Sequence, residues 1–435
     1  MGRGVLTTHM TEKPSASLTV STWFGQPRGL TILFLTQMWE DFSYYGMRAL
    51  LVYYMTQQLM LSQEKASLIY GAYTATAYFT PIFGGIIADR WLGKMRAVMA
   101  GGAIMAAGHF MMTFEPLFYP ALATIALGNG LFLPSLPSQI NDLYRTDDPR
   151  RRWAYNVYYV GINLGGFLAP LVCGTLGELY GWHWGFGAAG LGMLAGLLIY
   201  SAGRHYLPAA FPSKAGSAPT NTSMRDLRSL AMGLLAVCAA VTIFRGAYEQ
   251  VGNTVALWAE FAVDRRAGTS VIPMTWFQSL NPLLISLLTP ALLARWRRRA
   301  SRGREYSSLR KMAVGALIVS AAYLLLAAVA AHMGAQRSNW LWLVLFFLIL
   351  TLGELYILPT GLGLFGRLAP PGLTATTVAA WFLTIFAGSL TAGAVGTLWS
   401  STTHTTFFLI LAGFAAASSL VLLALDRAPM FSQAP

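Results

Sequence analysis

Acidic and basic side chains lie close together inside an apolar segment near the start of the chain. Residues 37–48 read Gln-Met-Trp-Glu-Asp-Phe-Ser-Tyr-Tyr-Gly-Met-Arg, which places Glu40, Asp41 and Arg48 within nine residues. An ionisable group at the centre of a bilayer costs at least about 2.5–3.5 kcal/mol. Groups that carry such a cost can bind or move protons, ions or charged solutes. The cluster therefore indicates a transport pathway.

The composition indicates that these charges do lie in a membrane. Of the 435 residues, 55% are hydrophobic and 11% are charged, with a mean hydropathy of +0.52. A soluble domain carries roughly 25% charged residues, so a soluble globule is excluded. Apolar runs of about 20 residues predict membrane helices. There are twelve such runs, at 29–59, 66–88, 95–114, 117–143, 152–178, 183–203, 229–262, 272–295, 308–333, 339–366, 373–399 and 404–425. The run at 339–366 is interrupted by Pro359 and several glycines.

A polar segment divides these helices into two groups of six. Residues 204–228 are predicted to form a linker, because 207–222 are rich in Pro, Ala, Ser and Thr. The expected organisation is an all-α polytopic membrane protein with a tail at 1–28, one six-helix bundle at 29–203, a second at 229–425 and a tail at 426–435. A weak repeat supports the two halves, since related loops at 84–94 and 292–299 follow the second and eighth helices.

The basic residues predict the orientation, because cytoplasmic loops retain Lys and Arg. Lys65, Arg265, Arg266 and Arg337 fall on one side, and the loops of the other side carry most of the rest of the 30. Both termini and the linker are therefore predicted to be cytoplasmic. The net charge of +13 then reflects loops that set topology and contact anionic lipid, and no binding of nucleic acid is expected.

Two of the predicted helices carry a polar face. At about 100° per residue, four side chains of the first helix fall on one stripe, and three of the seventh recur at intervals of four residues. Such stripes could pair across a cavity, and the alternative is a static ion pair that only fixes helix packing. The stripes are Gln37, Asp41, Tyr44 and Arg48 in the first helix, and Arg245, Glu249 and Asn253 in the seventh.

Several motifs resemble those of one transporter family. Residues 84–94 (Gly-Gly-Ile-Ile-Ala-Asp-Arg-Trp-Leu-Gly-Lys) resemble a loop signature of the major facilitator superfamily. Residues 158–165 and 37–46 resemble the Phe-Tyr-x-x-Ile-Asn-x-Gly and Glu-x-x-Glu-Arg-Phe-x-Tyr-Tyr-Gly motifs of its proton-coupled oligopeptide transporters (POT/PTR). Further matches lie in order through both halves, at 128–132, 248–250, 278–282, 353–355 and 381–382.

This resemblance implies a fold and a location. The fold would be that of the major facilitator superfamily, with two six-helix bundles that rock around a central site to give alternating access. The location would be a bacterial inner membrane, and we expect a monomer. The conformational loop between the second and third helices would contain Gly85, Asp89, Arg90 and Gly93.

The resemblance also implies roles for single positions. Arg48 and Glu249 match a gate pair that makes and breaks during transport. Independently of the resemblance, burial could raise the pKa of a membrane carboxylate toward neutral, so the candidates for proton coupling are Glu40, Asp41, Glu249 and Glu354. The predicted substrate cavity is lined by Tyr44, Tyr45, Tyr78, Asn163, Arg245, Asn281, Glu354 and Trp381.

Three ionisable positions depart from the family motifs. Gln37 replaces a Glu, Asp41 replaces an Arg, and Leu133 replaces a Lys, where the Arg and Lys of the family are implicated in gripping the peptide carboxylate. A cavity altered in this way should repel a free carboxylate unless another cation replaces the lost ones. Arg245 is the candidate, and one hypothesis is that it interacts with Asp41. The other is a capped, cationic or otherwise modified peptide-like substrate.

The predicted function is secondary transport of peptides or peptide-like molecules, coupled to protons. The alternatives are an exporter of a modified peptide or drug-like product with altered or no coupling, and a transport-inactive sensor. We find no catalytic spacing of nucleophile, metal ligands or paired acids, so an enzyme is not expected, and neither is a cofactor or a metal site.

Overall fold

The chain folds into twelve long helices, seen in a computed structural model that describes residues 22–23, 25–144, 148–208, 224–334, 336–368 and 374–428. The long helices are α1 (Arg28–Tyr53), α2 (Gln63–Ile87), α3 (Lys94–Met111), α4 (Phe118–Ser138), α5 (Arg151–Ala169), α7 (Trp182–Gly203), α8 (Met224–Tyr248), α10 (Leu280–Ala300), α11 (Ser308–Met333), α12 (Trp340–Leu368), α13 (Thr374–Gly396) and α14 (His404–Asp426). Each corresponds to one predicted membrane helix.

Short elements connect them. Helices α6 (Thr175–Tyr180) and α9 (Thr254–Phe261) continue α5 and α8 beyond short turns, and six strands of two residues each pair within loops. The strands are β1 (Thr22–Trp23), β2 (Gln26–Pro27), β3 (Val263–Asp264), β4 (Arg266–Ala267), β5 (Ser270–Val271) and β6 (Ser338–Asn339).

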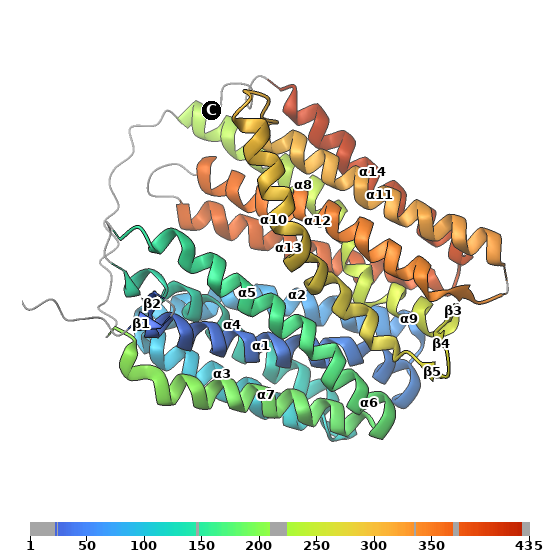
Figure 1. Ribbon diagram of the computed structural model, residues 1–435, viewed down its shortest axis with the longest axis horizontal. Helices are drawn as coiled ribbons and strands as arrows, with labels where there is room; N and C mark the ends of the chain where they lie inside the picture. The colour runs from blue at the N-terminus through green and yellow to red at the C-terminus, as the bar shows by residue number, and fades with distance from the viewer. Residues whose placement is uncertain are drawn as a thin grey trace, which may run out of the picture.

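The helices form two bundles of six long helices each. Figure 1 shows α1 to α7, in blue and green, as one bundle below the second, which runs from α8 to α14 in yellow to red. Within the described residues, nine helical segments, those built around α4, α5, α7, α8 and α10 to α14, are long and apolar enough to cross a membrane by length and composition alone. The charged α1 is not among them, as expected for a helix that buries carboxylates. Most of the predicted linker lies outside the described residues, and α8 begins within its end, at Met224.

The predicted seventh helix is interrupted, contrary to our prediction of one helix over 229–262. After α8 the backbone tightens into a 3₁₀ turn at Glu249–Gly252, leaves helical geometry at Asn253, and resumes as α9. The other half approaches closely at this break, since a Cβ on Gly252 would lie 2.1 Å from the hydroxyl of Tyr70. The break therefore brings the end of α8 against α2.

The predicted interruption at Pro359 is wrong. Helix α12 continues through this proline to Leu368. Membrane helices tolerate proline because neighbouring groups satisfy the freed backbone carbonyl. The helix predicted at 152–178 is instead modified by a π-helical turn at Pro170–Gly174, between α5 and α6.

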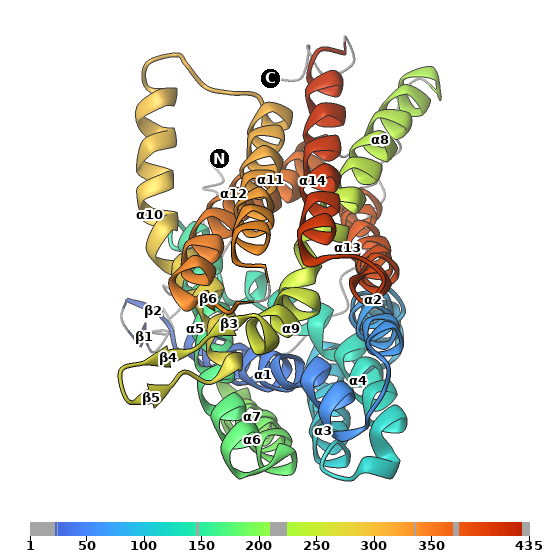
Figure 2. The same ribbon diagram turned by 90° about the vertical axis from the view of Figure 1, so that its right-hand side faces the viewer.

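The two halves bind each other at one end of the molecule. We call this the distal end, formed by the turns at 54–62, 262–273 and 397–403, and we call the opposite end, where 204–208 and Met224 lie, the linker end. Figure 2 looks onto the distal end and shows α9 and β3 to β5 nearest the viewer, between the bundles. The start of α1 and the end of α14 lie at the linker end, on the left of Figure 1.

A carboxylate at the distal end joins the halves through several hydrogen bonds. Glu178 of α6 accepts hydrogen bonds from the backbone N–H groups of Met274 and Thr275, both at 2.9 Å, and from the Thr275 hydroxyl at 2.6 Å. These N–H groups begin the helical segment that leads into α10, and a helix N-terminus favours a negative charge. Arg265 lies 3.8 Å from the same carboxylate.

Smaller contacts surround this one. The Tyr53 hydroxyl donates to the Ala256 carbonyl at 2.9 Å, and Ser67 donates to the Asn253 side chain at 3.0 Å. At the linker end, by contrast, the ion pairs of Lys94 with Asp142 and of Lys311 with Glu305 each stay within one half. The structure is thus held closed across the halves at the distal end.

Two glycines, Gly71 and Gly393, allow the backbones of α2 and α13 to come into contact. A Cβ on Gly71 would lie 2.5 Å from the Cα of Gly393 and 2.7 Å from the Ser389 carbonyl oxygen. Figures 1 and 2 both show α2 beside α13. Since only glycine fits here, the backbones of the two halves come into direct contact at this point.

Candidate functional site

A cavity lies between the halves and encloses about 970 Å³ of empty space, part of it open to solvent. Its walls come from both bundles, because α1, α2 and α5 supply one side and α8, α10 and α12 supply the other. Six of the predicted substrate residues line it, namely Tyr45, Tyr78, Asn163, Arg245, Asn281 and Glu354, together with the predicted gate residues Arg48 and Glu249.

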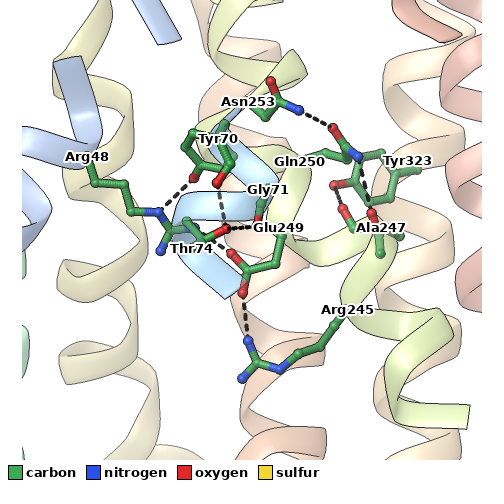
Figure 3. Close-up of polar contacts among 11 residues, drawn as sticks. Arg48, Tyr70, Gly71, Thr74, Arg245, Ala247, Glu249, Gln250, Asn253 and Tyr323 are labelled. Carbon is green, nitrogen blue, oxygen red and sulfur yellow. Dashed lines mark hydrogen bonds and ion pairs between the residues drawn. The ribbon is translucent and has the colours of Figure 1, made fainter. Parts of the chain in front are cut away.

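A buried network of two arginines and one glutamate crosses the halves at this cavity. Glu249, at the start of the 3₁₀ turn after α8, forms an ion pair with Arg48 of α1, and its other oxygen accepts a hydrogen bond at 2.6 Å from Nη1 of Arg245. Arg48 also donates from Nε to the Tyr70 hydroxyl at 2.7 Å. Figure 3 shows Glu249 between the two guanidinium groups. One carboxylate therefore pairs with two cations.

The local backbone explains this arrangement. Arg245 and Glu249 lie one helical turn apart on α8, so that their side chains share a face. The 3₁₀ turn that starts at Glu249 carries this carboxylate toward α1 and α2. Buried charges are stable only when they are paired and hydrogen-bonded, which this network achieves for Glu249.

A second acidic group faces the cavity from α12. Asn281 of α10 donates from its amide nitrogen to the carboxylate of Glu354 at 2.6 Å and to the hydroxyl of Thr351 at 3.1 Å. Glu354 is 7% exposed. The cavity thus offers a carboxylate and an amide on one wall and the arginines at its distal side.

The carboxylates of Glu40 and Asp41 do not line the cavity. They lie within the first half, where Gln37 donates from its amide nitrogen to Glu40 at 2.6 Å and to Asp41 at 2.7 Å. Tyr158 of α5 donates its hydroxyl to the oxygen of the same Gln37 amide. The replacement of a Glu by Gln37 therefore supplies the two donors that hold these carboxyl groups.

The structure corrects the hypothesis that Asp41 and Arg245 interact. Arg245 contacts Glu249 on its own helix, whereas Asp41 contacts Gln37 on its own helix. Asp41 points toward α5 rather than across the cavity, since its Cβ packs at Gly165. Both residues therefore find partners one turn away instead of across the halves.

Two predicted substrate residues lie outside the cavity lining. Tyr44 is 6% exposed, and its ring stacks on Tyr73 at a centroid distance of 6.4 Å. Trp381 is 4% exposed, packs on Phe365, and fills the space left by the missing Cβ of Gly361. In this conformation both are packing residues.

The predicted conformational loop lies at the linker end. Residues Ala88–Leu92 form a π-helical turn, and Gly93 starts α3 with a φ of +76°, a conformation that L side chains rarely adopt. Gly85 packs near Pro134, and Asp89 and Arg90 are exposed. A role of this loop in conformational change stays a prediction.

Our sequence reasoning missed several lining residues. Tyr159, Tyr248 and Gln278 contribute to the cavity, as do Ile162 and Pro282. Each lies within a matched motif, next to a residue or one helical turn from a residue that we did predict. The helical spacing of Tyr159 from Asn163 was the signal that could have identified it.

Comparison with known proteins gives a consistent result. The sequence model of the POT family (PTR2) matches residues 95–223 and 209–412. The chain is 32% identical to the peptide transporter YePEPT of Yersinia enterocolitica, over 86% of this chain and 88% of that protein. It is 31% identical to a di-/tripeptide transporter of Lactococcus lactis subsp. cremoris, over 90% and 93%.

A solved structure is similar throughout. The crystal structure of a peptide transporter POT, in a mutant form in complex with alafosfalin, superposes with a TM-score of 0.88 at 30% identity, covering 95% of this chain and 97% of that chain. The predicted twelve-helix fold and the predicted family are therefore confirmed.

Proposed function

The chain belongs to the POT family, and on this premise we propose that it moves peptides or peptide-like small molecules across the membrane by alternating access. The observation that supports this proposal best is the cavity between the halves, closed on its distal side by the Arg48–Glu249 pair. A site between two bundles that can rock against each other is the arrangement that alternating access requires.

The ligands of relatives support the substrate class. One relative is a di-/tripeptide transporter, and a similar solved structure contains alafosfalin, a peptide-like molecule. The cavity suits such ligands because it combines arginines, a carboxylate, amide side chains and tyrosine rings. We place the protein in a bacterial inner membrane as a monomer, with the linker end toward the cytoplasm, because the linker end carries most of the Lys and Arg residues.

Transport can be tested with the purified protein in liposomes. We expect labelled alanyl-alanine to enter liposomes preloaded with the unlabelled dipeptide, since such exchange needs only the alternation of the two states. Exchange does not depend on whether the protein works as an importer or an exporter in the cell. Binding of the dipeptide without any exchange would contradict transport and favour a sensor.

We further propose that Glu40 and Asp41 together hold a coupling proton. Glu40 and Asp41 are 3% and 7% exposed, and their described hydrogen bonds come from the neutral amide of Gln37. Two carboxylates that share one site do not both ionise readily, because their charges repel. A proton on one of them removes that repulsion and leaves the other to accept from Gln37.

The double variant Glu40→Gln, Asp41→Asn tests this proposal. We expect it to lose the accumulation of dipeptide that is driven by a pH gradient, because no carboxyl group of the pair remains to carry the proton. It should keep dipeptide exchange, which also shows that it is folded. Glu305→Gln, which removes an exposed carboxylate of the 301–307 loop, serves as the control. Full gradient-driven accumulation by the double variant would overturn the proposal.

A further inference from the structure

The arginine pair at the cavity has more positive charge than its carboxylate can compensate. Arg48 and Arg245 both contact Glu249, so this network carries a net charge of about +1 when all three groups are ionised. Glu354 of α12 faces the same cavity, but it accepts its described hydrogen bond from Asn281 of the neighbouring α10, and among the described residues it forms no ion pair with either arginine. The network is therefore a site at which an anionic group entering the cavity is attracted.

Arg245 is the member of the pair with a buried hydrogen-bond donor that has no described partner. Arg48 uses Nε on Tyr70 and Nη2 on Glu249. Arg245 uses Nη1 on Glu249, whereas its Nε is buried and has no partner among the described residues. Figure 3 shows one terminal nitrogen of Arg245 on Glu249 and the other pointing away from it. A buried donor without a partner is costly, so a ligand that accepts from it is favoured.

Neighbouring residues leave space for the Arg245 side chain and contact its guanidinium group. A Cβ on Gly388 of α13 would lie 2.3 Å from the Cβ of Arg245, so glycine at this position makes room for the stem of the arginine. The Tyr248 ring lies 5.8 Å from the guanidinium carbon, within the range of a cation–π contact. Arg245 is thus held at the cavity wall with 7% of its surface exposed.

We propose that Arg245 binds an anionic group of the substrate, such as the free carboxylate of a peptide. This inference rests on the proposed function and specifies which substrates the cavity accepts. The guanidinium has a planar fork of donors, and the edge formed by Nε and Nη2 matches the two oxygens of a carboxylate. The ligand draws this edge toward the cavity, which leaves Glu249 to pair with Arg48 alone.

This assignment explains how the cavity keeps a carboxylate site despite its altered first half. Asp41 and Leu133 stand where the family motifs have an Arg and a Lys, so the first half supplies neither of these cations. Arg245 lies on α8, in the second half. The anion would therefore bind to the opposite bundle from the one that the family motif predicts.

Binding to purified protein tests the proposal with alanyl-alanine and its C-terminal amide, which differ in the anionic group. We expect wild-type protein to bind the free dipeptide at least about tenfold more tightly than the amide, because a charge-assisted pair is lost in the amide. Arg245→Gln should weaken binding of the free dipeptide by at least about tenfold and change binding of the amide by less than about threefold. Arg245→Lys, which keeps the charge but loses the fork, should be intermediate.

Controls separate this role from a structural one. Arg96→Gln removes an exposed arginine of α3 and should leave both affinities unchanged. Retained binding of the amide by Arg245→Gln shows that the variant is folded. Equal loss of both ligands in Arg245→Gln, or equal affinity of the wild type for both, would overturn the inference while leaving transport intact. Binding of neither ligand by the wild type would overturn the proposed function, and this inference with it.

Discussion

Glu249→Gln is expected to reduce dipeptide exchange by at least about 100-fold. The variant leaves Arg48 and Arg245 in a buried site without their shared carboxylate. Removing one partner of a buried ion pair costs about 3–5 kcal/mol, and each 1.4 kcal/mol is a factor of ten. This cost destabilises the state that is closed at the distal end. The open state is affected less, because water reaches Arg48 when that end opens. The cycle needs both states, so it slows accordingly.

The measurement is the initial rate of exchange in liposomes at matched protein content. Glu260→Gln is the control, because Glu260 also lies on the second half at the distal end, but its bond to Gln57 is exposed. Exposed polar contacts contribute little, so this variant should retain most of the activity. A Glu249→Gln variant that exchanges at more than about a third of the wild-type rate would show that the gate does not depend on the pair.

Glu178→Gln is expected to open the distal end without blocking the cavity. The substitution keeps the size of the side chain, but the NH₂ group of Gln cannot accept a hydrogen bond. One of the two backbone N–H groups, of Met274 or Thr275, therefore loses its acceptor. Hydrogen bonds to a charged group contribute about 1.5–3 kcal/mol. Even a loss of 1–2 kcal/mol shifts the equilibrium between the two states by a factor of roughly 5–30.

The shift can be measured as a distance distribution between spin labels on Met60→Cys and Val271→Cys, two exposed positions on opposite halves of the distal end. The background carries alanine in place of Cys173 and Cys238. We expect a longer-distance population to grow in Glu178→Gln. Glu64→Gln removes the charge from another contact between the halves, the exposed carboxylate that accepts a hydrogen bond from Ser400, and should change the distribution much less. Identical distributions for all three proteins would refute a role for Glu178 in closure.

The sequence was sufficient to predict the helices and the two polar stripes that carry Arg48 and Glu249, whose role as a gate stays a prediction. Apolar runs of membrane length leave few alternatives to a helix, so each of the twelve runs has a counterpart in the structure. The polar stripes through Arg48 and Glu249 recur at helical spacing, and the two stripes do meet across the halves. Length and periodicity are properties of one segment, which is why they could be interpreted without tertiary information.

Side-chain pairing could not be predicted in the same way. The expected contact of Asp41 with Arg245 required two helices to have a particular rotation, and each residue instead has a partner one turn away on its own helix. Trp381 was expected at the cavity but fills the space beside Gly361. The Tyr70 hydroxyl of the other half occupies the space beside Gly252, where α8 gives way to α9. These features follow from how neighbouring helices approach, which spacing along one helix does not specify.

The position of the contact between Gly71 and Gly393 along α2 determines how far the halves move at each end of the molecule. Gly71 lies eight residues from the distal end of α2 and sixteen from its other end. At 1.5 Å per residue, these two lever arms measure about 12 and 24 Å. If the halves pivot where their backbones touch, the long arm travels twice as far as the short one. If the two halves separate by about 5 Å at the distal end, they approach each other by about 10 Å at the linker end.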